Sequence, residues 1–231
     1  QAERELIRHI GAPGLMQAEV LSFTRLADRV LEVAGGSALP YINQRGRAMA
    51  VSKLLLDNAD GLHAYAAYVR SPGFASQLAT EISEFKRFDI QPAQLAAAAE
   101  TPQLEDISFI YDLYVNEIGS RYYDSEDRMN MMIDKLPAAA FLRGACVFID
   151  GFEMLTSQIY RLVAAMLCPC AELNITLRVG GEHDQDAPRF TTAQKHLRRG
   201  VKIAHGAGVQ PGLLPLPAGG PGGGQRHQSK A

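Results

Sequence analysis

A carboxylate at the end of an apolar run is the first residue in this sequence whose position suggests chemistry. Residues 147–155 read VFIDGFEML, so Asp150 follows a short apolar stretch. An Asp at the carboxyl end of a central strand can hold a Mg²⁺ ion that bridges phosphate oxygens. Nucleotide hydrolases of this kind place next to it a Glu that orients the attacking water, whereas here the next residue is Gly151. Taken alone, the stretch is better explained by a strand-terminal Asp that caps a turn.

A catalytic strand of this type needs a phosphate-binding loop with the pattern G-x-x-x-x-G-K-[ST]. The glycine-containing segments 11–14, 35–36 and 180–181 all lack the lysine, and Lys230 is not preceded by glycine. No segment of this sequence is therefore expected to cradle a triphosphate in that way. We expect no complete catalytic site, and the chain alone is predicted not to be an ATPase.

The segment LSFTRLADRVL at residues 21–31 has residue types that suit single-stranded nucleic acid. A hydroxyl from Thr24 and backbone N–H groups at a helix start can bind a phosphate. Phe23 can stack on a base, and Arg25 can contact a base edge or the backbone. The simpler alternative places Phe23 in the core, uses Ser22 or Thr24 as the N-cap and leaves Arg25 in solvent.

The segment EFKRF at residues 84–88 combines basic and aromatic residues, as many nucleic-acid contacts do. The more economical prediction places Phe85 and Phe88 in the core and Lys86 and Arg87 on the surface.

A group of acidic residues between 122 and 127 resembles a metal-binding cluster. A capped helix start, with Ser125 as the N-cap and acids in the first turn, explains these residues with fewer assumptions. The six histidines are scattered, and the Cys-Pro-Cys at 168–170 lacks the spacing of a zinc site. No metal site is predicted.

The elements that would position these residues follow from hydrophobic periodicity. Apolar runs predict strands at 18–23, 145–150 and 172–179, and the second is apolar on both faces, as in a central parallel strand. Helical spacing predicts helices over 1–10, 23–34, 44–58, 71–88, 91–100, 104–118, 122–136, 156–167 and 190–204. Strand–helix units thus enclose an all-helical stretch, which implies a parallel sheet with helices on its faces.

Composition sets the wider limits. The chain has 231 residues, 47% of them hydrophobic, and a net charge of −2, which argues against a broadly basic surface but allows a local groove. No apolar stretch approaches the length of a membrane span, and three cysteines favour a reducing cytosol. The sequence starts inside a predicted helix without Met, so we expect it to be part of a longer protein.

In combination, these segments resemble superfamily I, UvrD-like DNA helicases, and more closely the B-subunit family of bacterial AddAB (RexAB) helicase–deoxyribonucleases. The resemblance rests on LSFTRLADRVL at 21–31, EFKRF at 84–88, DSED at 124–127, and IDGF at 149–152 with Thr156 and Gln158. It extends from Gln1 to about Ala204, and its specificity lies in the order of the motifs rather than in any single one.

The resemblance implies an α/β fold like that of P-loop NTPases, with the parallel sheet of a superfamily I helicase domain 1A and a helical 1B-type insert. The first strand and the phosphate loop are expected just upstream of Gln1. The expected bounds are 1–35 and 138–205 for the helicase-like α/β domain, 36–137 for the helical insert subdomain, and 206–231 for a Gly/Pro-rich loop or linker.

The resemblance also implies a function. Such complexes resect double-strand breaks, and the helicase-like region of the B subunit does not translocate but reads a Chi sequence on the single strand. By position, the implied DNA-binding residues are Phe23, Thr24, Arg25 and Phe152, and the vestigial Walker B residues are Asp150 and Gly151. Asp28 departs from the aromatic residue that some members have there, so the resemblance does not imply that this chain recognises the same Chi sequence.

The implied partners are an AddA-type motor and nuclease subunit and single- or double-stranded DNA ends, in the bacterial cytoplasm near the nucleoid, without a membrane. ATP with Mg²⁺ and a 4Fe–4S cluster belong to the full-length family, and no cofactor is expected in this chain. The alternative is a structural scaffold that docks the motor subunit without reading DNA, which the net charge of −2 favours.

Overall fold

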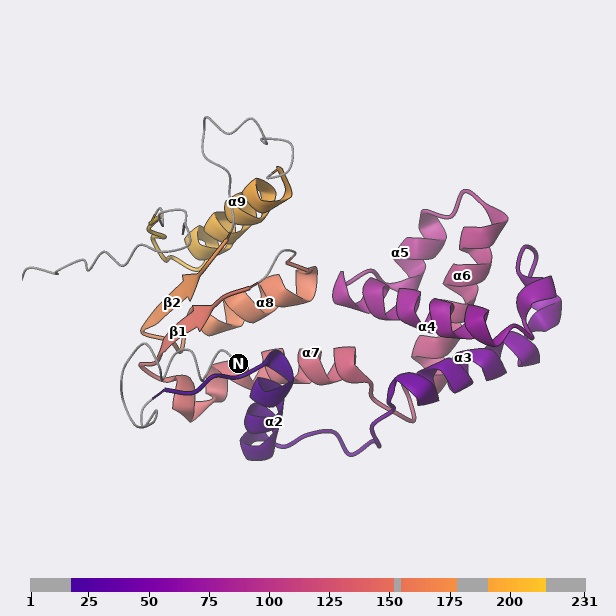
Figure 1. Ribbon diagram of the computed structural model, residues 1–231, viewed down its shortest axis with the longest axis horizontal. Coiled ribbons are helices and arrows are strands. Elements are labelled where there is room, and N and C mark those ends of the chain that lie inside the picture. The colour runs from indigo at the N-terminus through magenta and orange to yellow at the C-terminus, as the bar shows by residue number, and fades with distance from the viewer. Residues whose placement is uncertain (1–17, 152–154, 178–190, 215–231) are drawn as a thin grey trace, which may run out of the picture.

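The computed structural model describes residues 18–151, 155–177 and 191–214. Within them the elements form two groups, seen at the left and the right of Figure 1. The first group contains a small sheet and four helices: α2 (Phe23–Ala34), α7 (Ser125–Lys135), β1 (Cys146–Ile149), α8 (Ser157–Met166), β2 (Glu172–Ile175) and α9 (Thr191–Gly206). The second contains α3 (Gln44–Asp57), α4 (Pro72–Arg87), α5 (Pro92–Ala97) and α6 (Pro102–Leu113).

Short helical turns complete the described chain. Four are 3₁₀ turns, at Ala59–Gly61, Ala66–Tyr68, Leu136–Ala138 and Ala140–Leu142. A π-helical turn, Tyr114–Ile118, continues α6. The predicted helix at 104–118 is therefore present, but its last turn is wider than an α-helix.

The sheet consists of β1 and β2, which run parallel with α8 as the connection between them. The register pairs Cys146 with Glu172 and Ile149 with Ile175. This βαβ unit confirms an α/β architecture that is mostly helical. The prediction that β1 is apolar and buried on both faces was wrong for the described chain, because the Phe148 side chain is 73% exposed.

The predicted strand at 18–23 is also absent. Residues 18–22 are not part of a strand in the described chain, and the helix α2 already begins at Phe23. An apolar run favours a strand only where a neighbouring strand satisfies its backbone groups, and sequence periodicity does not show that neighbour.

Local chemistry explains the helix ends. The Ser22 hydroxyl accepts a hydrogen bond from the Arg25 backbone N–H at 3.3 Å and so caps α2. Gly35 ends the same helix with φ +79, a conformation that glycine adopts without steric cost. Thr156 caps α8 as predicted, because its hydroxyl accepts from the backbone N–H of Ile159.

Two clusters of buried apolar side chains stabilise the two groups of elements. The first joins α2, α7, β1 and α8, and its most buried members include Val30, Met132 and Leu162. The second joins α3, α4, α5 and α6 around Val51, Ile82 and other side chains. Helix α7 contributes its apolar residues to the first cluster, although the predicted insert reaches residue 137; the domain bounds stay a prediction.

Among the described helices, none combines the length and the apolar character that crossing a membrane requires.

Candidate functional site

The first turn of α2 holds three of the four predicted DNA-binding residues. Phe23 is partly buried and packs against the first apolar cluster, whereas Thr24 and Arg25 are exposed. The Arg25 side chain donates a hydrogen bond from Nη1 to the carbonyl of Val20 at 3.3 Å. Ser22, not Thr24, caps the helix, so the Thr24 hydroxyl is not used by the cap. The simpler alternative is thus present, because Phe23 packs against the core, Ser22 caps the helix and Arg25 faces solvent.

A small pocket of about 150 Å³ opens beside this turn. Its walls come from α2, from α7 and from the linker between α2 and α3. The lining residues are Phe23, Thr24, Ala27, Tyr41, Ser125, Arg128 and Met129. The structure therefore brings two of the predicted residues together with an aromatic residue, Tyr41, that the sequence did not single out.

Asp150 and Gly151 lie at the carboxyl end of β1, as predicted. The carboxylate of Asp150 is exposed and accepts a hydrogen bond from the hydroxyl of Thr176, just beyond β2. Thr176 also donates its backbone N–H to the carbonyl of Ile149 at 3.0 Å. Asp150 thus cross-links the ends of two neighbouring strands through its side chain.

Gly151 has φ +82, in the region that side-chain-bearing residues rarely adopt. A Glu at this position would be strained, although a Cβ there would meet no atom within 4 Å. The backbone itself therefore differs from that of a strand end suited to a Glu. Phe152, the fourth predicted DNA-binding residue, lies outside the described residues.

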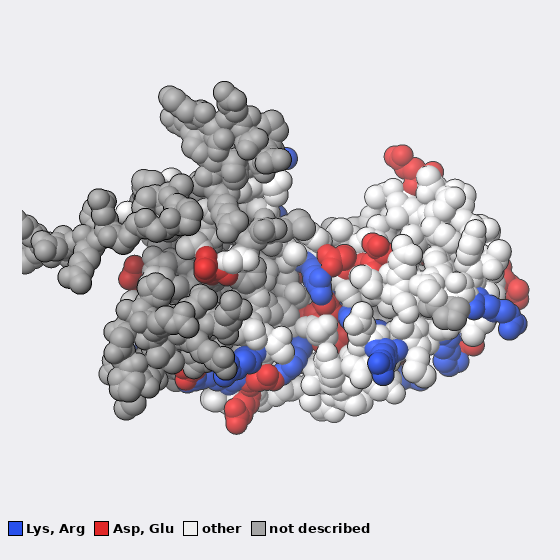
Figure 2. Space-filling view, in the orientation of Figure 1, with Lys and Arg blue, Asp and Glu red and all other residues white. Residues whose placement is uncertain are grey.

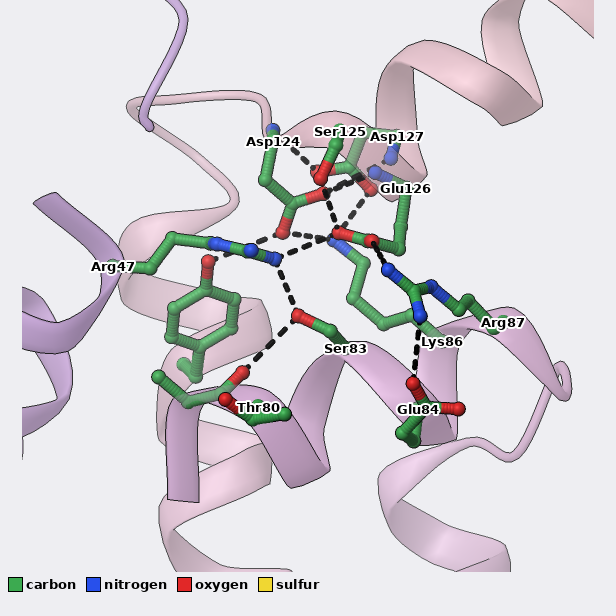
Figure 3. Close-up of polar contacts among 12 residues, drawn as sticks. Arg47, Thr80, Ser83, Glu84, Lys86, Arg87, Asp124, Ser125, Glu126 and Asp127 are labelled. Carbon is green, nitrogen blue, oxygen red and sulfur yellow. Dashed lines mark hydrogen bonds and ion pairs between the residues drawn. The ribbon is translucent and has the colours of Figure 1, made fainter. Parts of the chain in front are cut away.

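The sequence missed a buried ion-pair network that joins the two groups of elements (Figure 3). It connects the segments EFKRF and DSED. Lys86 in the first and Asp124 in the second are 38 residues apart in the sequence. The Lys86 ammonium contacts the carboxylates of Asp124 at 2.6 Å and Asp127 at 2.7 Å. Lys86 is only 12% exposed, so the prediction that it lies on the surface was wrong. Burial is favourable here because two carboxylates compensate the lost hydration of the ammonium.

A second arm of the network runs from α3. Arg47 contacts Glu126 at 2.7 Å and donates a hydrogen bond to the hydroxyl of Ser83. Arg87 reaches the other oxygen of Glu126 at 3.3 Å. Glu126 is 3% exposed, so α7 is held at its first turn by cations from both α3 and α4. Figure 2 shows acidic and basic side chains side by side where the two groups of elements meet.

The acidic residues of this network form a helix cap and not a metal site. Asp124 is the N-cap of α7, because its carboxylate accepts hydrogen bonds from the backbone N–H groups of Glu126 and Asp127. Ser125 was predicted as the cap, but it is the first helical residue, and its hydroxyl donates to Glu126. Among the residues that the structure describes, no group of three His, Cys, Asp or Glu side chains could hold a metal ion.

The pKa values of Asp124 and Asp127 are shifted in opposite directions. Burial opposes the ionisation of Asp124, but the Lys86 ammonium and hydrogen bonds outweigh it and lower the pKa of this carboxyl. Burial raises the pKa of Asp127, and the neighbouring Asp124 raises it further. Burial together with Asp124 also raises the pKa of Tyr114, whose hydroxyl donates to Asp124 at 3.1 Å. The network thus holds Asp124 charged at its centre.

Two aromatic predictions for EFKRF have different outcomes. Phe85 packs against the second apolar cluster, as predicted, and its ring contacts that of Tyr111 with centroids 5.6 Å apart. Phe88 was expected in the core, but it follows the last residue of α4 and is 38% exposed.

A further cluster that the sequence did not indicate links α8 to α9. Tyr160 Oη and His196 Nδ1 are 2.5 Å apart, and the backbone N–H of Leu155 donates to His196 Nε2 at 3.4 Å. The proton of the neutral ring is therefore on Nδ1, facing Tyr160. Burial, with a smaller effect from Arg199, lowers the pKa of His196.

The face of the molecule seen in Figure 2 has mixed charge. On the face seen in Figure 2, basic side chains alternate with acidic ones, and the described residues show no continuous basic band there. A nucleic-acid contact on this face would accordingly be local rather than spread over the whole face.

Comparison with known proteins gives a consistent result. The model of a family described as "ADDB, N-terminal" matches residues 1–213. The B subunit of the ATP-dependent helicase/deoxyribonuclease of Alkaliphilus metalliredigens is 35% identical over 213 residues, which cover 88% of this chain and 18% of that protein. Proteins with the same name from Moorella thermoacetica and Alkaliphilus oremlandii are 34% and 33% identical, over 77% and 94% of this chain and 16% and 20% of their own lengths. The chain thus spans about a fifth of the length of these relatives.

Proposed function

The chain belongs to the AddB N-terminal family, and from this premise we propose that it is the helicase-like, non-motor region of the B subunit in an ATP-dependent helicase/deoxyribonuclease. In this role it binds and scans the single strand produced by unwinding, during the resection of double-strand breaks. The proposal extends to a P-loop NTPase-like 1A fold around β1, α8 and β2. An AddA-type subunit would supply the motor activity.

The observation that carries the DNA-binding proposal is the first turn of α2. Thr24 and Arg25 present a hydroxyl and a guanidinium to solvent at a helix start, where the helix dipole favours an anion. Phe23 and Tyr41 line a pocket directly beside them. A cation, a hydroxyl and an aromatic ring within one turn, with a second ring from the linker beside it, are groups that can bind a phosphate and its base together.

The strand end supports a role without ATP hydrolysis. Gly151 provides no carboxylate to orient water, and the side chain of Asp150 is engaged by Thr176. The φ of Gly151 means that restoring a Glu would also require a change of backbone. Turnover of ATP by the full-length subunit in the absence of a motor subunit would contradict this part of the proposal.

A comparison of two arginine variants tests DNA binding. We would measure fluorescence anisotropy of a labelled single-stranded oligonucleotide with the full-length subunit and its partner, at several salt concentrations. Arg25→Ala should weaken binding and reduce the salt slope by about 0.7, as expected for one lost phosphate contact on a single strand. Arg70→Ala removes the same charge from an exposed position in the second group of elements and serves as the matched control.

Equal affinity and equal slope in the two variants would contradict binding at α2. The response to Chi gives a second readout that does not depend on total affinity. Phe23→Ala and Phe152→Ala should each diminish it, because base stacking on an aromatic ring contributes about 1–3 kcal/mol. An unchanged response in both variants would remove Phe23 and Phe152 from the site.

One observation favours the alternative function, a scaffold that docks the motor subunit. Phe148 is 73% exposed in the middle of β1, and Cys146 is exposed on the same face of the sheet. An exposed apolar sheet face is a common feature of interaction surfaces. The scaffold role alone would be supported if Phe148→Ser released the partner subunit while Arg25→Ala left DNA binding intact.

A further inference from the structure

We infer that the pocket beside the first turn of α2 is a subsite for one nucleobase of single-stranded DNA, and that Tyr41 is the residue that stacks on this base. The inference rests on the proposed function and adds a residue and a ligand to it. Tyr41 lies outside the segments that carry the family resemblance, and only the tertiary structure brings it to α2.

Tyr41 combines exposure with a fixed position. Its side chain is 48% exposed, yet the backbone on both sides of it is held by the segment before α7. The N–H of Ile42 donates to the carbonyl of Tyr123 at 2.9 Å, and the N–H of Tyr123 donates to the carbonyl of Pro40 at 3.1 Å. These bonds form an isolated parallel bridge between Tyr41 and Tyr123.

The ring of Tyr41 is also supported from its side. It packs against the ring of Tyr123, with centroids 5.4 Å apart and planes at 61°. Edge-to-face packing of this kind contributes to stability and fixes the orientation of both rings. An exposed aromatic ring that is already oriented loses little conformational entropy when a ligand stacks on it.

The pocket has the size and the chemistry of a site for a single base. Its volume of about 150 Å³ suits one planar heterocycle rather than a whole nucleotide. Phe23, Tyr41 and Met129 line it with apolar and aromatic side chains, and Thr24 and Arg128 add a hydroxyl and a guanidinium to the lining. Such donors can bind the ring nitrogens and carbonyl oxygens at the edge of a base.

The charges around the pocket fit this ligand. Arg128 already pairs with Asp28 across α7 and α2, so its charge is balanced and its remaining N–H groups can bind a neutral base edge. Arg25, which is exposed on the same turn of α2 as Thr24, has no carboxylate partner among the described residues and suits the phosphate. The site therefore separates a base-binding part from a phosphate-binding part.

Photochemical cross-linking tests the inference directly. The full-length subunit with its partner would be irradiated on a single strand that contains 5-iododeoxyuridine, which cross-links to aromatic side chains in contact with the base. Mass spectrometry should place a cross-link on Tyr41. The yield at this segment should fall at least about 5-fold in Tyr41→Leu, because the variant removes both the aromatic acceptor and the stacking contact.

Two further variants control for folding. Tyr41→Phe keeps the ring and should retain the cross-link, which shows that the segment is still in place. Tyr68→Leu changes an exposed tyrosine in the second group of elements, 56% exposed, and should leave the yield at Tyr41 unchanged.

The possible outcomes distinguish failure of the Tyr41 subsite from failure of the proposed DNA-binding function. Cross-links on the 21–31 segment without any on Tyr41, or an equal yield from the 37–47 segment in Tyr41→Leu, would overturn the subsite and leave DNA binding standing. If no cross-link formed on any residue of this chain, the proposed DNA-binding function itself would be contradicted.

Discussion

Replacing Lys86 with methionine keeps the length of the side chain but removes its charge from the centre of the buried ion-pair network between α4 and α7. The ammonium is 12% exposed and lies within 2.7 Å of both Asp124 and Asp127. In Lys86→Met the carboxylate of Asp124, only 2% exposed, would remain buried without its cation. We therefore expect α4 and α7 to separate more easily.

The expected loss of stability in Lys86→Met follows from the contacts that Asp124 would keep. Removing one partner of a buried ion pair costs about 3–5 kcal/mol. Asp124 would keep the hydroxyl of Tyr114 and the backbone N–H groups of Glu126 and Asp127 as donors. These three donors continue to stabilise the charge, so we place the loss at the lower end, about 3 kcal/mol.

Native-state hydrogen exchange in the full-length subunit gives a local measurement. Peptides that cover α4 and α7 should exchange roughly 100-fold faster in Lys86→Met, since 1.4 kcal/mol corresponds to a factor of ten. Lys53→Met is the matched control, because Lys53 and Asp57 form an exposed i,i+4 pair on α3. Such a surface pair contributes only about 0.3–0.5 kcal/mol.

The reasoning would be refuted if Lys86→Met changed exchange in α7 no more than Lys53→Met. A second variant sharpens the test. Lys86→Met combined with Asp124→Asn removes both charges, and it should recover part of the lost protection, because no unpaired charge then remains buried.

Three other predictions concern positions outside the ion-pair network between α4 and α7. Gly151→Glu should destabilise the β1 end by about 1–2 kcal/mol, because φ +82 disfavours a side chain, whereas Gly36→Glu should not; thermal unfolding compares them. Asp106→Ala should loosen residues 63–65 by about 3 kcal/mol, since the buried carboxylate accepts their backbone N–H groups, while exposed Asp112→Ala serves as the hydrogen-exchange control. The lowered pKa of His196 means that the folded state binds its proton less readily than the unfolded state, so stability from the α8–α9 contact should fall as the pH drops below about 6.5. His196→Gln should flatten that dependence in urea titrations between pH 5 and about 8.

Much of the helical structure could be predicted from the sequence, because helix formation depends on neighbours three and four residues away. The start of α2 at Ser22, its end at Gly35 and the cap of α8 at Thr156 all follow from local residue types. The sequence motifs also identified the family, and the family model confirmed it. The position of Asp150 at a strand end was predicted for the same local reason.

Predictions failed where a distant partner decides the outcome. The run at 18–23 has the composition of a strand but no strand beside it in the described chain, and Phe148 has the character of a core residue but lies on an exposed face. Lys86 was assigned to the surface because lysine is usually exposed. A carboxylate 38 residues further along the chain makes its burial favourable.

The sequence by itself determined most of the described helices, the N-cap of α8, the family and the residue types at the first turn of α2. Only the tertiary structure decided that EFKRF and DSED form one buried ion-pair network and that Tyr41 lines a pocket with Phe23. The physical reason is that capping and periodicity are interactions within a few residues, whereas burial and charge pairing depend on which segments meet in space. That meeting is fixed by the packing of α7 against α2 and α4.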